Sequence, residues 1–237
     1  MSLIGQRILA VVPARGGSKG IERKNLKAVR GLSLIARAAR VISETPIIDR
    51  AVCSTDDPAI AAEAERHGLS APFVRPAELA SDSAKSIDVW RHAWLDSERR
   101  DGVLYDLSML IEPTSPLRRA SDLERTVSAM LDARAKAAAT VSPTAAHFTP
   151  QKTLTVGSDG RIGFFLANGA QFSRRQDIAP YFHRNGVCYS ARRDTVITRG
   201  TLLEDDCVAV VIDRPVVNID EPFDLEVAEL LAAKEAW

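Results

Sequence analysis

The residues best suited to do chemistry lie just after the first apolar run of the chain. Residues 8–13 are apolar and of strand length, and they are followed by a loop that combines glycines with cations. Glycines can adopt positive φ values and bring backbone N–H groups close to an anion, while full positive charges stand beside them. We therefore predict a polyphosphate cradle formed by Gly16, Gly17 and Gly20 together with Arg15, Lys19, Arg23 and Lys24.

The loop does not match either of the two commonest glycine fingerprints. Its spacing is neither G-x-x-x-x-G-K-[ST] nor G-x-G-x-x-G. Taken alone, it also fits an ordinary turn with solvated lysines. Its position after a strand nevertheless favours a nucleotide site, because ligands of parallel α/β sheets bind at the carboxyl ends of the strands.

The bulk properties exclude several classes of protein. The 237 residues carry 31 cations and 31 anions, so overall charge does not favour nucleic-acid binding. Apolar runs are much shorter than the ~20 residues that span a bilayer, and the first residues do not resemble a secretion signal, so we expect a cytoplasmic protein without a membrane partner. Cys53, Cys188 and Cys207 are expected to be buried reduced thiols, and the four histidines lack the spacing of a zinc site.

Strand-type and helix-type patterns alternate along most of the chain. This order predicts an α/β fold: a mostly parallel, Rossmann-like sheet with helices on both faces, forming a single domain over residues 1–237. An insertion at about 147–185 reads as a hairpin arm, with a turn at 157–160. The expected strands are 8–13, 49–54, 71–74, 106–111, 137–142, 186–190 and 207–212. Helices are expected at 32–44, 57–68, 83–97, 121–134 and 220–233, with Ser121 and Glu124 forming a capping box.

A series of short motifs then occurs in a recognisable order, and it spans nearly the whole chain. The motifs are Val12-Pro-Ala-Arg-Gly-Gly-Ser-Lys-Gly20, Arg23-Lys24-Asn25, Cys53-Ser-Thr-Asp56, Arg75-Pro-Ala-Glu-Leu-Ala-Ser-Asp82, Glu112-Pro-Thr-Ser-Pro-Leu-Arg118, Arg175-Gln176, Asn185-Gly186 and Asn218-Ile-Asp220. The set resembles the acylneuraminate cytidylyltransferases, also called CMP-sialic acid synthetases.

The resemblance implies a nucleotidyltransferase fold and a reaction between CTP and a 2-keto-3-deoxy sugar acid, with Mg²⁺. The products would be a CMP-sugar and pyrophosphate. Within this pattern, Arg15, Lys24 and Asn25 would hold the phosphates, and Arg75 and Ser86 would contact the nucleoside. Two plainer alternatives remain open: Arg75 could simply pair with Asp82 or Glu78, and the Asp82-Ser83 pair could be a helix cap.

The sugar site and the metal site depart from the family pattern. Glu112 stands where the family usually has glutamine, so an acceptor-only carboxylate replaces a donor. Asn218 precedes Asp220 where two aspartates commonly hold Mg²⁺, so we expect binding through Asp220 with help from Asn218. The alternative is that Asp220 caps the last helix.

The resemblance assigns the remaining sugar contacts to the arm and to the strand that follows it. Arg175 would meet the sugar carboxylate across a homodimer, and Lys152 and Asn185 would assist. Three functions are therefore compared: a cytidylyltransferase for a nonulosonic acid such as a sialic, legionaminic or pseudaminic acid; the same chemistry on an octulosonate; and a nucleotide-binding homologue that has lost catalysis.

Overall fold

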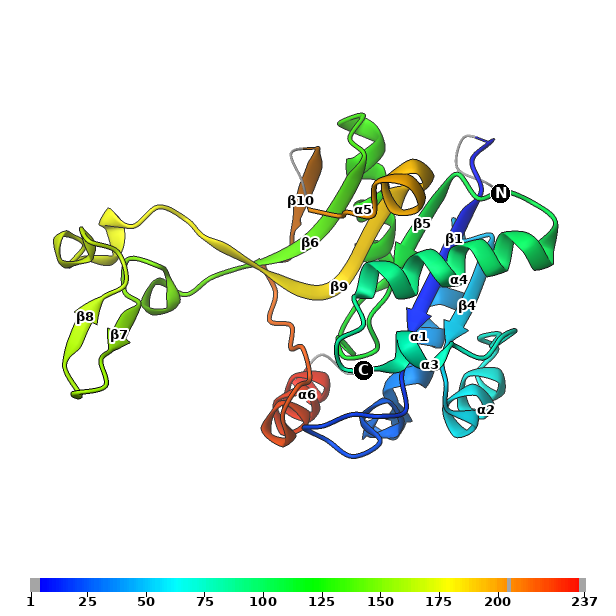
Figure 1. The fold of residues 1–237 in the computed structure, drawn as a ribbon, viewed down its shortest axis with the longest axis horizontal. Coiled ribbons are helices and arrows are strands. Elements are labelled where there is room, and N and C mark those ends of the chain that lie inside the picture. The colour runs from blue at the N-terminus through cyan, green and yellow to red at the C-terminus, as the bar shows by residue number, and fades with distance from the viewer. Residues whose placement is uncertain (1–4, 204–205, 235–237) are drawn as a thin grey trace.

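A six-stranded sheet forms the centre of the protein, whose computed structural model describes residues 5–203 and 206–234. The strand order is β10-β6-β9-β5-β1-β4 (Figure 1). Only β9 runs antiparallel to its neighbours in this sheet. The strands are β1 (Ile8–Pro13), β4 (Arg50–Ser54), β5 (Leu107–Leu110), β6 (Ala137–Pro143), β9 (Phe182–Arg192) and β10 (Cys207–Val211).

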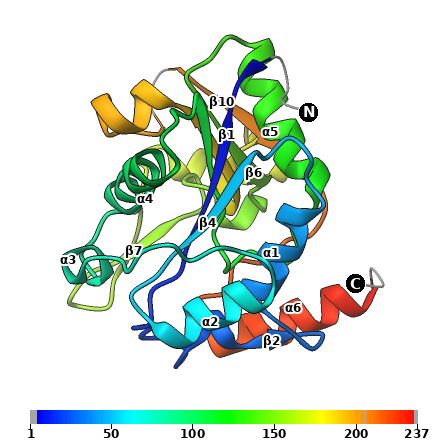
Figure 2. The ribbon, with the colours of Figure 1, turned by 90° about the vertical axis from the view of Figure 1, so that its right-hand side faces the viewer.

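Helices cover both faces of this sheet, as the alternating pattern predicts. Along β1, Ile8, Ala10 and Val12 are buried against α1, α2 and α5. Leu9 and Val11 point to the other face and pack with the two tryptophans of α4. Figure 2 shows α4 and α1 on opposite sides of the sheet. The helices are α1 (Leu34–Ser43), α2 (Pro58–Arg66), α3 (Ala77–Ala80), α4 (Ser86–Asp101), α5 (Ala120–Asp132) and α6 (Pro222–Lys234).

Short elements complete the chain. A small antiparallel ladder, β2 (Ala28–Val29) with β3 (Leu32–Ser33), leads into α1. Single turns of 3₁₀ helix are η2 (Lys24–Leu26), η3 (Ala146–Phe148), η4 (Gly169–Gln171) and η5 (Arg175–Asp177), and η6 (Thr195–Arg199) is a π-helical turn. None of the helices within the described ranges is both long and apolar enough to cross a bilayer.

Three local predictions are wrong. Residues 71–74 form no strand, because the segment contacts β4 only through isolated bridges. The box of Ser121 and Glu124 does not open α5: this helix begins at Ala120, and the Asp122 carboxylate accepts from the Arg119 N–H at 2.8 Å. Neither Asp82 nor Ser83 caps α4, whose N-cap residue is Lys85.

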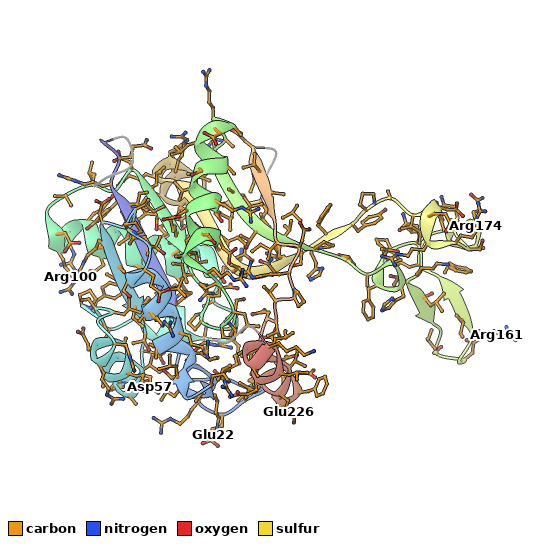
Figure 3. All side chains as sticks on the ribbon, turned by 180° about the vertical axis from the view of Figure 1, so that it is seen from behind. Glu22, Asp57, Arg100, Arg161, Arg174 and Glu226 are labelled. Carbon is orange, nitrogen blue, oxygen red and sulfur yellow. The ribbon has the colours of Figure 1, made fainter. Side chains whose placement is uncertain are left out.

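The insertion forms an arm that extends from the body of the protein. β6 and β9 continue past the sheet as a two-stranded stem that ends with Pro143 opposite Phe182. At the tip, β7 (Leu154–Val156) and β8 (Ile162–Phe164) pair as the predicted hairpin. Figure 3 shows Arg161 and Arg174 at this far end, well away from the helices that cover the sheet.

The cysteines fit the expectation of free thiols. Cys53 and Cys188 are buried, and Cys207 is half-buried. Burial raises the pKa of both Cys53 and Cys188 to about 12, so neither is ionised near neutral pH.

His92 makes the stability of this fold depend on pH. Burial lowers its pKa, and its Nδ1 has no hydrogen-bond partner while the ring packs edge-on against Phe73. The unfolded chain binds this proton near pH 6.5, so stability must fall as pH drops below that value. We expect His92→Phe to reduce the loss of unfolding free energy between pH 6.5 and 5. For a single proton the slope of this loss cannot exceed about 1.4 kcal/mol per pH unit.

Urea unfolding across this pH range measures the slope directly. His147→Phe serves as the control, because His147 is exposed on the arm. Equal slopes for the wild-type protein and the His92 variant would contradict the assignment.

Candidate functional site

A cavity of about 470 Å³ lies where the predicted motifs meet, beside the carboxyl ends of β1 and β5. Most of the residues expected to bind nucleotide or metal line it, although they come from widely separated parts of the chain, and Glu112 of the predicted sugar site joins them. The nucleotide and metal residues are Arg15, Lys19, Lys24, Asn25, Arg75, Ser86, Asn218 and Asp220. The fold thus brings the basic loop, the end of β5 and the segment before α6 together around one cavity.

Two glycines of the basic loop, Gly16 and Gly20, are needed for close packing and not for their dihedral angles. None of Gly16, Gly17 and Gly20 has the positive φ that we expected. A Cβ at Gly16 would lie 2.8 Å from the Asp57 carboxylate, and one at Gly20 would lie 2.5 Å from the backbone oxygen of Asp220. Gly20 therefore lets the loop pass directly against the proposed metal residue.

Two cations of the loop converge on one carboxylate. Arg15 Nη1 lies 2.8 Å from Asp82 Oδ1, and Lys19 Nζ lies 2.6 Å from Asp82 Oδ2. These contacts, the Lys19 hydrogen bond first among them, lower the pKa of Asp82. The N–H of Gly16 donates in turn to Asp56 Oδ1 at 2.9 Å.

Lys24 and Asp220 form the second ion pair of the cavity. Lys24 Nζ donates to Asp220 Oδ1 at 3.0 Å and to the backbone oxygen of Ile219 at 2.8 Å. Asp220 does not cap α6 with its side chain. Asp224 takes that place, since its carboxylate accepts from the N–H groups of Asp220 and Glu221, at 2.8 Å each.

The donor set at Asp220 suits a hard divalent ion. Asn218 and Asp220 are exposed while Ile219 between them is buried, so both side chains lie on the cavity side. The Asn218 amide nitrogen faces Asp220 Oδ2 at 3.4 Å, and the amide oxygen makes no hydrogen bond with the residues that the structure describes. Within residues 5–203 and 206–234 there is no group of three or more His, Cys, Asp or Glu side chains that could hold a metal. An ion here would take its remaining ligands from phosphate and water, as Mg²⁺ commonly does.

Asn25 and Arg75 support the site from below its surface. Asn25 is buried, and its amide donates to the backbone oxygen of Arg15 at 3.0 Å, which fixes the loop. Arg75 pairs with neither Asp82 nor Glu78. Its guanidinium instead donates to the hydroxyl and the backbone oxygen of Ser54 at the end of β4, and burial lowers its pKa.

Ser86 is placed at the first residue of α4, as predicted. No side chain caps this helix end, and its first N–H groups and positive dipole end therefore remain available beside the cavity.

Glu112 stands just beyond the end of β5, at the wall of the cavity. Its carboxylate makes no hydrogen bond with the described residues, and its Oε2 lies 2.6 Å from the position of a Cβ on Gly186, which has φ +68°. Burial raises the pKa of Glu112, with the nearby Asp220 charge acting in the same direction. A ligand with a hydrogen-bond donor would satisfy this carboxylate.

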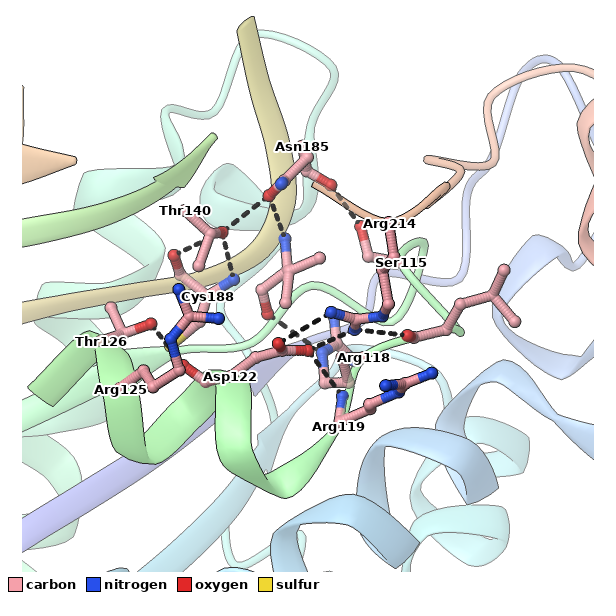
Figure 4. A network of polar contacts seen from close by, with 12 residues as sticks. Ser115, Arg118, Arg119, Asp122, Arg125, Thr126, Thr140, Asn185, Cys188 and Arg214 are labelled. Atoms are coloured by element: carbon pink, nitrogen blue, oxygen red, sulfur yellow. Dashed lines mark hydrogen bonds and ion pairs between the residues drawn. The ribbon is translucent and has the colours of Figure 1, made fainter. Parts of the chain in front are cut away.

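A buried arginine, Arg118, holds Glu112 in place. Figure 4 shows Arg118 beside Asp122 and Arg214 in a network of polar contacts. Arg118 donates to the backbone oxygens of Glu112 and Gly186, and its Nε donates to Val187 at 3.0 Å. Only 1% of this residue is exposed, and burial lowers its pKa to about 10. The same network contains Asp122, which binds Arg214.

Three residues predicted for the sugar lie outside this cavity. Asn185 is buried, with its amide between Thr140 Oγ1 at 2.7 Å and Ser142 Oγ at 3.0 Å, so it braces β9 against β6. Lys152 and Arg175 lie on the arm. Lys152 Nζ donates to the backbone oxygen of Ser173 at 3.1 Å, and Arg175 lines a separate cavity of about 440 Å³ near the arm stem.

Sequence reasoning missed the roles of Asp82, Asp56 and Arg118, although each lies within a motif that it used. A carboxylate in a motif opposite a basic loop is a signal for an ion pair, but the sequence does not show which cation it meets. An arginine two residues after a proline gives no sign that it will be buried.

Comparison with known proteins identifies the family. The family model described as "Cytidylyltransferase" matches residues 9–202. The chain belongs to the cytidylyltransferase family. This confirms the resemblance to the acylneuraminate cytidylyltransferases and the nucleotidyltransferase fold.

Curated relatives cover nearly the full length of this cytidylyltransferase. It is 28% identical over 224 residues to the pseudaminic acid cytidylyltransferase of Campylobacter jejuni, covering 94% of this chain and 95% of the relative. It is 28% identical over 233 residues to the CMP-N,N'-diacetyllegionaminic acid synthase of Legionella pneumophila, covering 95% and 96%. Among solved structures, CMP:2-keto-3-deoxy-manno-octonic acid synthetase complexed with CTP has a similar fold, with a TM-score of 0.70, 20% identity, and coverage of 97% of this chain and 99% of that chain.

Gly20→Ala tests the close passage of the loop beside Asp220. The added Cβ would meet a backbone oxygen at 2.5 Å, which cannot move without shifting the proposed metal residue. We expect a loss of about 1–3 kcal/mol in the free energy of unfolding, as for other forced contacts, together with weaker nucleotide binding.

Gly17→Ala is the matched control, because a Cβ there meets nothing within 4 Å. Urea unfolding of both variants measures the difference. Similar losses would show that loop flexibility, and not the contact with Asp220, determines the effect.

Proposed function

We propose that this cytidylyltransferase transfers CMP from CTP to a 2-keto-3-deoxy sugar acid of the nonulosonic type, releasing pyrophosphate. The observation that carries the proposal is one cavity in which Arg15, Lys19 and Lys24 face Glu112 and Asp220. The cations supply charge for a triphosphate. The carboxylates supply a metal contact and an acceptor for a second substrate.

The nucleotide half of the site lies between the basic loop and the start of α4. Arg15, Lys19 and Lys24 would bind the phosphates, with Gly16 and Gly17 allowing close approach of the loop and Asn25 keeping it in shape. The nucleoside would lie toward Arg75 and Ser86, where the uncapped helix end offers N–H donors.

Mg²⁺ would be held by the Asp220 carboxylate and the Asn218 amide oxygen, which are the oxygen donors available at this wall. When bound, the ion would neutralise part of the triphosphate charge. Lys24 would then share Asp220 with the ion or turn toward the phosphates.

The reaction needs positioning and charge neutralisation more than a protein nucleophile. The anomeric hydroxyl oxygen of the sugar acid forms a bond to the α-phosphorus of CTP. The bond from that phosphorus to the bridging oxygen breaks, pyrophosphate departs, and the hydroxyl proton is released to a base. Lys24 and Arg15 would stabilise the negative charge that develops on the departing pyrophosphate.

The arm supports the proposal of a homodimer. It extends away from the body and exposes large apolar side chains, which an isolated chain would leave in water (Figure 3). These are Phe148, Leu154, Val156, Ile162, Phe164 and Phe165. A second copy that received this arm would obtain Arg175 and Lys152 at its sugar site.

The full-length relatives favour a nonulosonic acid over the shorter octulosonate. The relatives named for pseudaminic and legionaminic acids match over at least 94% of this chain, whereas the likeness to the octonic acid synthetase supports the fold alone. Retention of Arg15, Lys24 and Asp220 in one cavity argues against the alternative of a non-catalytic homologue.

Pyrophosphate release tests the function directly. CTP and Mg²⁺ are incubated with sialic, legionaminic, pseudaminic and octulosonic acids in turn. Turnover on a nonulosonic acid is the expected outcome. Preference for the octulosonate would select the second hypothesis, and CTP binding without turnover on any acid would select the third.

Lys24→Ala should lower kcat by about 10²- to 10³-fold, the typical effect of removing a group that stabilises developing charge. Lys27→Ala is the control, because Lys27 is exposed and outside the cavity. Steady-state kinetics on both variants provide the measurement. An effect on kcat below tenfold would remove Lys24 from the leaving-group role.

Arg175→Ala should raise the KM for the sugar acid roughly 10- to 100-fold and leave the KM for CTP unchanged, because it removes a charged hydrogen bond to the sugar carboxylate alone.

Mixing this variant with Lys24→Ala tests the dimer. If the arm acts across the interface, mixed dimers contain one intact site and regain activity. Absence of recovery after subunit exchange would contradict the arrangement in which the arm serves its partner.

A further inference from the structure

Carboxylates of the protein itself occupy the anion-binding groups of the cradle. Arg15 and Lys19 contact Asp82, Lys24 contacts Asp220, and the N–H of Gly16 donates to Asp56. A triphosphate needs the same donors. Its binding therefore requires at least one carboxylate to leave its place.

We propose that Asp82 is a latch across the nucleotide site. Its carboxylate holds Arg15 and Lys19 together in the ligand-free protein and is exchanged for phosphate oxygens when a polyphosphate binds. The inference rests on the proposed function only in assuming that this cavity receives a polyphosphate.

The geometry of the latch matches that of a phosphate bridge. Each oxygen of Asp82 meets one cation: Oδ1 lies 2.8 Å from Arg15 Nη1 and Oδ2 lies 2.6 Å from Lys19 Nζ. A phosphate group offers oxygens that can bridge the same two donors. Without an anion between them, the guanidinium and the ammonium would repel each other.

Asp82 is the carboxylate that can leave most easily. Asp220 is tied to α6 by the bond from its N–H to Asp224, and the N–H of Ile219 donates to the backbone oxygen of Thr114. Asp56 follows β4 directly. Exposure does not decide between them, because 69% of the Asp220 side chain is exposed and 46% of the Asp82 side chain. The difference lies in the backbone, since Asp82 belongs to the connection between α3 and α4.

The segment that carries Asp82 forms part of the cavity wall. Ser81, Asp82, Ala84 and Ser86 all line the cavity. Displacement of the Asp82 carboxylate would thus free the cations and also open the wall beside the start of α4. Exposed ion pairs are weak, so the more highly charged polyphosphate can replace them.

Titration calorimetry of wild type and Asp82→Asn tests the latch, with tripolyphosphate, CTP and cytidine as three separate ligands. The substitution keeps the shape of the side chain and removes its charge. We expect tripolyphosphate and CTP to bind roughly three- to tenfold more tightly to the variant. Cytidine binding should be unchanged, because cytidine has no phosphate to compete with Asp82.

Glu78→Gln is the matched control. It removes the same charge from the adjoining α3, where Glu78 is exposed and does not line the cavity. If both substitutions tighten tripolyphosphate binding equally, the cause is the long-range electrostatic effect of losing one negative charge, and the latch is overturned. Unchanged or weaker tripolyphosphate binding to Asp82→Asn would overturn it as well, and so would absence of tripolyphosphate binding to the wild-type protein.

The ligands separate this inference from the proposed function. If tripolyphosphate responds to Asp82→Asn as expected but CTP does not bind to the wild-type protein, the latch stands and the CTP-dependent function fails. If CTP is turned over normally but neither polyphosphate ligand binds more tightly to the variant, the function stands and the latch fails.

Discussion

Charge balance around the basic loop is the constraint on which the rest of the site depends. A loop that gathers three cations must remain folded when no anionic ligand neutralises them. The protein meets this requirement with carboxylates from distant segments, Asp82 before α4 and Asp220 before α6. These ion pairs also join the parts of the chain that must later contact one ligand. Binding can then proceed by exchange of anions within a cavity that already exists.

A second anchor lies beneath the opposite wall. The guanidinium of Arg118 binds carbonyl groups on both sides of the junction between the end of β5 and β9. Because Arg118 is fully surrounded, its position is determined by the core and not by the ligand. It holds Glu112 against Gly186, where no larger residue would fit. The wall that would face the sugar acid is therefore rigid, while the wall formed by residues 81–86 depends on exposed contacts.

Sequence patterns predicted the alternating strands and helices because apolar periodicity reflects burial on the two faces of a sheet. The resemblance to the acylneuraminate cytidylyltransferases then predicted that Lys24, Glu112 and Asp220 share one site, and all three line the same cavity. The sequence-based predictions were wrong where the role of a residue depends on another segment of the chain that passes beside it. The glycines of the loop were explained by dihedral freedom, but Gly20 is required because the backbone of Asp220 passes beside it. Asn185 was assigned to a ligand, but Thr140 and Ser142 use its amide within the fold.

The arm begins and ends at residues that already face each other. Pro143 pairs with Phe182 at the end of the stem, and the Thr144 N–H donates to the backbone oxygen of Tyr181 at 2.8 Å. The two ends of the insertion are therefore held together at the stem as in a hairpin, and this contact with the sheet does not depend on the length of the insertion. Because the entropy of closing a loop rises only slowly with length, evolution can lengthen, shorten or replace this segment with little effect on the nucleotide site. The fold thus separates the cavity beside β1 and β5 from an arm whose length and sequence can change independently of it.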